Sequence, residues 1–139
     1  GPVYVEAEKR KIGELLTPPR LWAAMQAGPA LKVSAPLRAA AAVTVSHYAD
    51  LTRNLTELRN RLAQLNVFHG AAKRAEWDKM IEAHAFEELA ASLIERHYDP
   101  RYTKSAARRD RAVTEVAVPR LDAETLDATA LKIKAMRAR

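Results

Sequence analysis

The sequence predicts a helix-rich α/β fold, in which a partial parallel sheet of about three strands carries a helical insert. Three observations predict it. The first 50 residues alternate between strand and helix patterns, the middle of the chain has only helical periodicity, and the last 28 residues return to one strand and one helix. Apolar residues make up 48% of the chain and charged residues 29%, with only four glycines, which is typical of an ordered protein.

The first 50 residues contain two predicted strands, each followed by a predicted helix. Residues 3–7 are a short β-rich run that ends in a charged stretch, so we expect a strand and then a polar loop. Thr17 precedes two prolines and is the expected N-cap of a helix at about 19–27, which Gly28 and Pro29 stop. Residues 30–34 alternate and predict a second strand, and Pro36 starts a helix from 37 to about 50.

The rest of the chain is predicted to be helical except for one strand. Leucines spaced by three and four residues predict an amphipathic helix over 51–65. Two further helices are expected at about 71–83 and 86–98, with a tight joint at 84–85 and an end at Asp99-Pro100. Residues 113–118 alternate as a third strand, and Asp122 caps the last helix.

These elements predict three segments: 1–50, 51–111 and 112–139. The first and last form the sheet part, and the middle is a helical insert that ends in a basic loop. Because parallel sheets are usually larger and covered on both faces, we expect the missing strands to come from an upstream segment. The chain opens on Gly-Pro without an initiator methionine, as an excised fragment would.

The composition favours some function classes and excludes others. Lys and Arg number 23 against 17 Asp and Glu, a formal charge of +6, which favours an anionic partner such as nucleic acid or phosphate. The absence of cysteine excludes a disulfide scaffold, a cysteine nucleophile and a thiolate metal site within these residues. No apolar run approaches the ~20 residues of a membrane span, and no signal sequence opens the chain. We therefore expect a cytoplasmic protein without a membrane partner.

Two familiar kinds of site are not predicted. Four scattered glycines cannot form a P-loop of the Gly-x-x-x-x-Gly-Lys-Ser/Thr type. The four histidines contain no pair at helical spacing that would bind one metal ion, so we expect no metal site and assign the histidines to capping or surface positions. The two tryptophans are expected in the core.

Two basic clusters are candidate phosphate or nucleic-acid sites. The stretch 96–111 is the denser one, with arginines interleaved with tyrosines, and its candidates are Arg101, Lys104, Arg108 and Arg109. A solvated loop explains that composition equally well. The second cluster follows the first predicted strand, where ligands of open α/β sheets bind, and contains Arg10, Lys11 and Arg20; pairing with Glu6 and Glu8 is the alternative.

Several of these segments also resemble a known family. The run VYVEAEKRKIG at 3–13, the prolines and Trp22 that follow, and His97-Tyr98-Asp99-Pro100-x-Tyr102 are similar to the C-terminal part of bacterial tRNA 2-selenouridine synthase, in the same order along the chain. The motif residues in this sequence are Glu6, Glu8, Gly13, His97, Tyr98, Asp99, Pro100 and Tyr102. The sequence departs from the family at Lys9, where a small residue is usual, and at Ala40, where an arginine is usual; Arg38 is the nearest candidate replacement.

The resemblance implies a fold, a reaction and partners. The parent enzyme would join a rhodanese-like domain to a P-loop domain, so that this chain forms a P-loop-like partial sheet. It would be a transferase that converts wobble 2-thiouridine of tRNA to 2-selenouridine through a geranylated intermediate, with selenophosphate and geranyl diphosphate as substrates. This segment would need no cofactor of its own and would contribute to tRNA or diphosphate binding, inactive alone. The resemblance assigns no catalytic residue. The alternative is a stand-alone, non-catalytic helical interaction module of the same fold.

Overall fold

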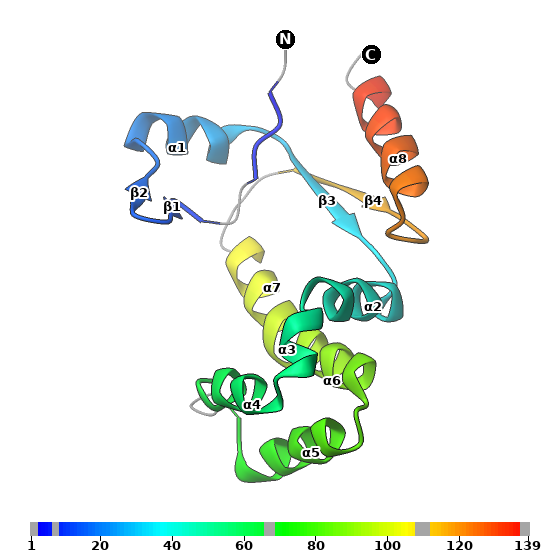
Figure 1. Cartoon of the computed structure of the whole chain (residues 1–139). Helices are drawn as coiled ribbons and strands as arrows, with labels where there is room; N and C mark the ends of the chain where they lie inside the picture. Colours follow the sequence, from blue (N-terminus) through cyan, green and yellow to red (C-terminus); the bar gives the residue numbers. More distant parts are fainter. Residues whose placement is uncertain (1–2, 7–8, 66–68, 108–111, 137–139) are drawn as a thin grey trace. The chain divides into compact units, whose positions relative to one another are not determined.

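The computed structural model describes residues 3–6, 9–65, 69–107 and 112–136, with only the backbone at 104–107 (Figure 1). The chain divides into two compact units. We call Gly1–Ser34 with Asp99–Ala117 the sheet unit, and Ala35–Tyr98 with Val118–Arg139 the helical unit. Most described residues are helical, so the helix-rich prediction is confirmed, whereas the P-loop-like topology and the three-segment division stay predictions.

The sheet unit begins without the predicted strand. Residues 3–6 are not in a strand, so that prediction is wrong for them, and Ala7 lies outside the described residues. The predicted polar loop instead contains a short antiparallel hairpin of β1, Lys11–Ile12, and β2, Leu15–Leu16. Gly13 has a φ of 59° at the first position of its two-residue turn, a conformation that favours glycine and suits a tight hairpin.

Helix α1, Pro19–Ala27, is confirmed at the predicted position, but its predicted cap is wrong. Pro18 is the N-cap, and its carbonyl accepts the backbone N–H of Trp22 at 2.9 Å. Thr17 cannot cap the helix from this position, and its own N–H donates to the carbonyl of Arg10 at 2.9 Å. Thr17 therefore extends the hairpin.

The parallel sheet has two strands among the described residues. β3, Ala30–Ser34, pairs in parallel with β4, Val113–Ala117, and the register places Lys32 beside Glu115 and Val33 beside Val116. Both strands agree with the predictions to within one residue. The first predicted strand is the missing one, because no partner pairs with residues 3–6 in the described part of the chain.

The helical unit begins with three helices where two were predicted. α2 is Leu37–His47, α3 is Ala49–Arg53 and α4 is Leu55–Ala63. The predicted continuous helix over 51–65 is wrong because it breaks at Asn54. The side chain of Asn54 accepts the N–H of Glu57 at 3.1 Å and so caps α4, which competes with continuing the helix.

The core of the helical unit lies between its later helices. α5 is Ala71–Glu82, and α6 is Phe86–Leu93; the predicted tight joint is confirmed, with His84 at a φ of 56°. Trp77, Ile81 and Leu89 are buried together, and α2 packs against α6. The side chains packed around them are Leu55, Leu58, Leu62, Met80 and Leu93.

The helix does not end at Asp99-Pro100, so the prediction of a helix end and a basic loop is wrong for 99–107. A π-helical turn, η2, Ile94–Tyr98, follows α6, and α7, Asp99–Ala107, continues it. In an α-helix Pro100 would leave the carbonyl of Arg96 unpaired and clash with it. A π turn pairs each carbonyl with an N–H five residues later, which removes the need for a donor at position 100.

Helix α8, Ala123–Met136, ends the described chain. The predicted cap is confirmed, because the Asp122 carboxylate accepts the N–H of Thr125 at 2.8 Å. That hydrogen bond is the main reason why the pKa of Asp122 is lowered. Among the described residues, no helix has the length and apolar character needed to cross a membrane.

Candidate nucleic-acid interface

A cationic segment of the sheet unit is formed by the hairpin and the start of α1. Arg10 lies at the base of the hairpin, where its Nε donates to the carbonyl of Thr17 at 3.0 Å. The backbone bond from Thr17 N to Arg10 O closes the same pair. These two bonds hold Arg10 in place while the outer end of its guanidinium remains available to an anion.

Lys11 on β1 and Arg20 on α1 continue this segment. Both side chains are exposed, and neither forms an ion pair with any residue that the structure describes. The sheet unit as a whole contains ten Lys and Arg against six Asp and Glu, a net +4 of the chain's +6. We call Arg10, Lys11 and Arg20 the cationic segment.

Lys32, another cation of the sheet unit, forms an ion pair within the parallel sheet. Lys32 Nζ lies 2.8 Å from Glu115 Oε1, and both side chains are exposed. The hydrogen bond between them raises the pKa of Lys32 and lowers that of Glu115. Lys32 is therefore neutralised by its neighbour on β4, unlike the cations of the hairpin.

The remaining candidate cations belong to other elements of the chain. Arg38 belongs to α2 of the helical unit, where its Nη1 lies 3.7 Å from Glu88. Arg101 is exposed on α7, and the backbone of Lys104 lies on the same helix. Arg108 and Arg109 lie outside the described residues.

The motif residues that precede α1 fall in different settings. Glu6 is exposed in a segment without secondary structure, and Glu8 lies outside the described residues. Gly13 forms the hairpin turn with positive φ, so its place in the motif has a conformational reason. The alternative interpretation, in which the basic cluster pairs with Glu8, concerns a residue outside the described ranges.

The second motif spans the π turn and the start of α7. His97 is buried with 4% of its surface exposed, so the expectation of a capping or surface position is wrong for it. Tyr98 and Tyr102 are both about half exposed, and Asp99 and Pro100 form the first turn of α7.

Sequence reasoning missed a pair of histidines in the helical unit. His69 Nε2 lies 3.0 Å from His97 Nδ1, within hydrogen-bond distance. The His69 ring also meets the indole of Trp77 edge-on, at 4.9 Å between ring centres. The two histidines are 28 residues apart, and no spacing rule connects them.

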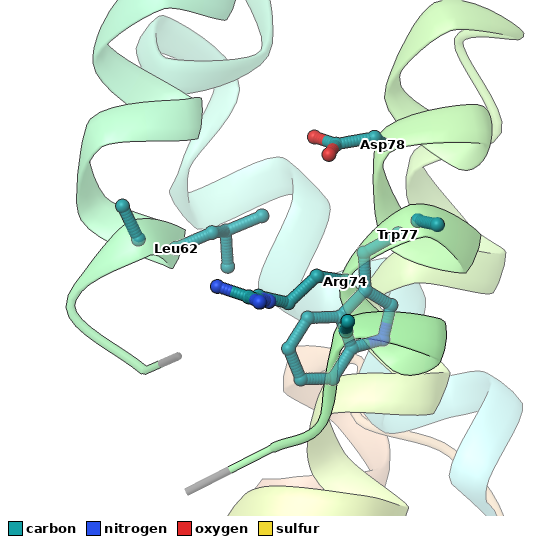
Figure 2. Close-up of a pocket in the computed structure, with 7 residues that line it drawn as sticks. Leu62, Arg74, Trp77 and Asp78 are labelled. Carbon is teal, nitrogen blue, oxygen red and sulfur yellow. The ribbon is translucent and has the colours of Figure 1, made fainter. Parts of the chain in front are cut away.

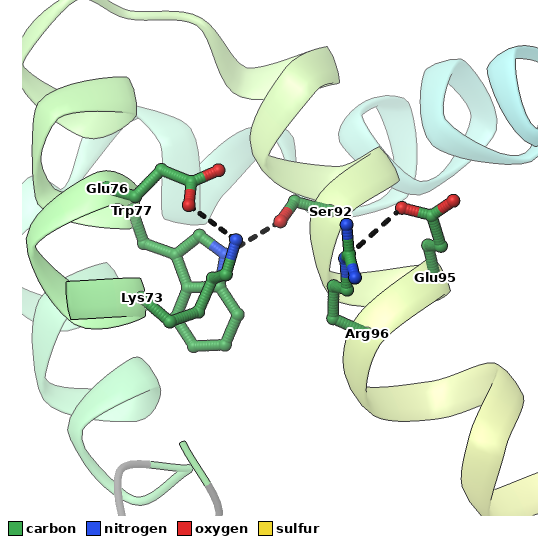
Figure 3. A network of polar contacts seen from close by, with 6 residues as sticks. All are labelled: Lys73, Glu76, Trp77, Ser92, Glu95 and Arg96. Carbon is green, nitrogen blue, oxygen red and sulfur yellow. Dashed lines mark hydrogen bonds and ion pairs between the residues drawn. The ribbon is translucent and has the colours of Figure 1, made fainter. Parts of the chain in front are cut away.

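A polar contact of Trp77 links α5 to α6, and ion pairs lie on either side of it (Figure 3). The indole Nε1–H donates to Ser92 Oγ at 2.9 Å, and Lys73 pairs with Glu76 beside it. Arg96 Nε lies 3.4 Å from Glu95 on the π turn. The charges in this network are balanced in pairs, so it offers little attraction to an anion.

A shallow pocket of about 320 Å³ opens on the other side of Trp77, between α4 and α5 (Figure 2). Arg74 extends across it toward Leu62, and Asp78 lies one turn further along α5. The remaining lining residues are Ala63, Ala71 and Ala75. Adjacent opposite charges and small side chains give this pocket no strong preference for an anion. Within the described ranges, no three acidic or histidine side chains could bind a metal ion together.

Comparisons with protein-family models, with curated proteins and with solved structures find no match.

Proposed function

We propose that this chain is the tRNA-contacting segment of a tRNA-modifying transferase, and that its cationic segment binds phosphate groups. The supporting observation is that Lys11 and Arg20 are exposed without ion pairs to described residues, while Arg10 is held at the base of the hairpin by Thr17. Arginine and lysine side chains bind phosphate oxygens directly, and a surplus of unneutralised cations drives binding through release of counterions.

The wider role follows the family resemblance. The parent enzyme would act in the cytoplasm on wobble 2-thiouridine, exchanging sulfur for selenium through a geranylated intermediate. Its substrates would be selenophosphate and geranyl diphosphate, and its cysteine and P-loop would lie in upstream rhodanese-like and P-loop segments. Because this chain contains neither group, we expect it to bind but not to catalyse when alone.

Binding of tRNA across a salt series tests the role of the cationic segment. The variant Lys11→Ala/Arg20→Ala removes two cations of the sheet unit. The matched control, Lys132→Ala/Lys134→Ala, removes two exposed cations of α8 that also form no ion pair with described residues. Both variants change the net charge equally, so only position distinguishes them.

We expect the slope of log K against log salt to fall by about 0.7 to 0.9 for each lost contact in the first variant and to stay constant in the control. Equal effects of the two variants would indicate attraction by net charge alone and would refute the assignment. Inorganic diphosphate distinguishes tRNA from diphosphate as the ligand of the cationic segment. If the segment is a diphosphate site, inorganic diphosphate should bind to it at concentrations that leave bound tRNA unaffected.

A non-catalytic interaction module is the second candidate. The observation in its favour is that the helical unit has its own buried core of Trp77, Ile81 and Leu89, without any cysteine or P-loop. A pull-down after nuclease digestion separates the two functions. A retained protein partner together with no measurable tRNA affinity would favour the module.

A further inference from the structure

The two histidines in contact within the helical unit, His69 and His97, are used by no part of the proposed function. We call them the histidine pair. His97 is buried on the π turn, and its Nδ1 lies 3.0 Å from Nε2 of His69, which precedes α5. Each ring also meets an aromatic side chain edge-on: His69 meets Trp77, and His97 meets Tyr98 at 5.0 Å between ring centres. The pair therefore joins the entry of α5 to the π turn.

The hydrogen bond of the histidine pair limits how many protons the two rings hold. Such a bond needs one N–H donor and one bare acceptor nitrogen. A neutral pair supplies both, and a pair with one added proton still does, with a charge-assisted bond. A second added proton leaves two N–H groups facing each other and two like charges together in a largely buried place. Separated histidines, in contrast, both take up a proton as the pH falls through about 6.5.

The histidine pair lies next to a weak helix start. Helix α5 has Gly70 as its N-cap, with no side-chain cap and no acidic residue in its first turn, so two usual sources of stability at a helix start are missing. The carbonyl of Gly70 accepts the N–H groups of Lys73 at 3.1 Å and Arg74 at 3.3 Å. Since His69 precedes Gly70 directly, its contacts tie this turn to buried side chains. Loss of the bond to His97 should therefore release the first turn of α5.

The other charged side chains around the histidine pair do not titrate in the same pH range. Three ion pairs lie on the surrounding elements: Lys73–Glu76 on α5, Glu95–Arg96 on the π turn, and Arg38 of α2 with Glu88 of α6 (Figure 3). Arg59 of α4 lies 3.9 Å from both Asp78 and Glu82 of α5. The other charged side chains of these elements and of the start of α7 are exposed, and they are Arg74, Lys79, Glu87, Asp99 and Arg101. Carboxylates ordinarily titrate near pH 4, and lysine and arginine above pH 10.

Two further histidines complete the set of four in the chain. His47 ends α2, where its Nδ1 lies 3.0 Å from the carbonyl of Val43, and His84 lies at the joint between α5 and α6 beside Phe86. Both are exposed. Between pH 7 and pH 5 the changes of side-chain charge in the helical unit therefore fall mainly on histidines, and these two serve as internal references for the pair.

We propose that the histidine pair is a pH-sensitive latch on the first turn of α5, closed while it holds at most one added proton and opened by the second. Opening is then coupled to uptake of about one further proton, so the opened fraction should rise about 10-fold from pH 6 to pH 5. Ala71, Arg74 and Ala75 of this stretch line the pocket beside Trp77, so the latch also controls one wall of that pocket. The proposal does not depend on tRNA binding.

Hydrogen exchange of the whole chain at pH 7, 6 and 5 tests the latch. The reporters are the amides of Lys73 and Arg74, and each rate is divided by the intrinsic rate at the same pH. We expect their protection to fall about 10-fold from pH 6 to pH 5. In His69→Gln it should not depend on pH, because the glutamine amide donates and accepts hydrogen bonds but does not titrate. The control His84→Asn should behave as the parent, since asparagine tolerates the φ of 56° at that position. Equal falls in the parent and in His69→Gln, or no fall in the parent, would overturn the proposal.

A proton count by NMR keeps the proposal testable if His69→Gln loses protection already at pH 7. Ring resonances of the four histidines are followed from pH 8 to pH 4.5 in the parent chain. The two rings of the histidine pair should take up their protons in two steps more than about one pH unit apart, because the first proton opposes the second, whereas His47 and His84 should each titrate in a single step. Independent single-step titration of His69 and His97 would refute the latch. Since neither measurement uses tRNA, failure of the latch is distinguishable from failure of the proposed function.

Discussion

The hydrogen bond between Trp77 and Ser92 gives a quantitative test of the helical core. Trp77 is only 2% exposed, so its indole N–H has little access to water when its partner is removed. The variant Ser92→Ala should therefore lower the free energy of unfolding by about 1–3 kcal/mol, the cost of a buried donor left unpaired. In a Trp77→Phe background the donor is absent, and the same change should cost less than about 0.5 kcal/mol.

The coupling between the two positions is thus expected to be about 1–2 kcal/mol. Urea unfolding followed by far-UV circular dichroism measures it without relying on the tryptophan that is changed. The matched control is Ser46→Ala, an exposed helical serine of α2, which should leave stability within about 0.5 kcal/mol of the parent. Equal costs of Ser92→Ala in both backgrounds would show that the indole N–H is satisfied elsewhere and would refute the reasoning.

Three further predictions concern the hairpin, the last helix and the basic stretch. Gly13→Ala should destabilise the sheet unit by about 1–2 kcal/mol in urea unfolding, because a φ of 59° is strained for alanine although the space around it is open; unchanged stability would show that the turn readjusts. The pKa of Asp122 is lowered, so its hydrogen bond to Thr125 stabilises α8 at pH values above 3.8, the ordinary pKa of the group. This stabilisation is lost as the pH falls through the lowered pKa. Melting should show a loss in Asp122→Ala at pH 7 that becomes smaller as the pH falls below 3.8, and equal losses at pH 7 and pH 3 would contradict the cap. Arg108→Ala/Arg109→Ala should lower the salt slope of tRNA binding by about 0.7 to 0.9 per charge without changing the melting temperature, and an unchanged slope and affinity would indicate a solvated segment.

Elements with strong local signals could be predicted from the sequence. The helix α1 lies between prolines and a Gly-Pro pair, and β3 alternates between similar breaks. The cap at Asp122 depends only on a carboxylate three residues before a backbone N–H. For α1 and the cap the deciding interactions lie within a few residues of one another, and β3 is bounded by local breaks on either side.

Contacts between distant positions of the chain could not be predicted. Residues 3–6 alternate as a strand does, yet alternation alone does not supply a neighbouring strand. The pair of His69 and His97 joins positions 28 residues apart, and the burial of His97 follows from packing rather than from its polar neighbours in the sequence. The cationic segment could be predicted because charge can be read from the sequence. The hydrogen bonds between Arg10 and Thr17 could not be predicted, because they depend on the hairpin.

The error at Pro100 shows how two local rules compete. The rule that a helix stops before proline assumes that the preceding turn is α-helical, so that the lost hydrogen bond and the ring clash both fall on the carbonyl of Arg96. In this chain the preceding turn is the π turn Ile94–Tyr98, which changes the pairing of that carbonyl. The same turn carries His97, which is buried there beside His69. A basic stretch that was expected as a loop thereby continues as a helix up to Ala107, and Arg101 is displayed from a regular surface.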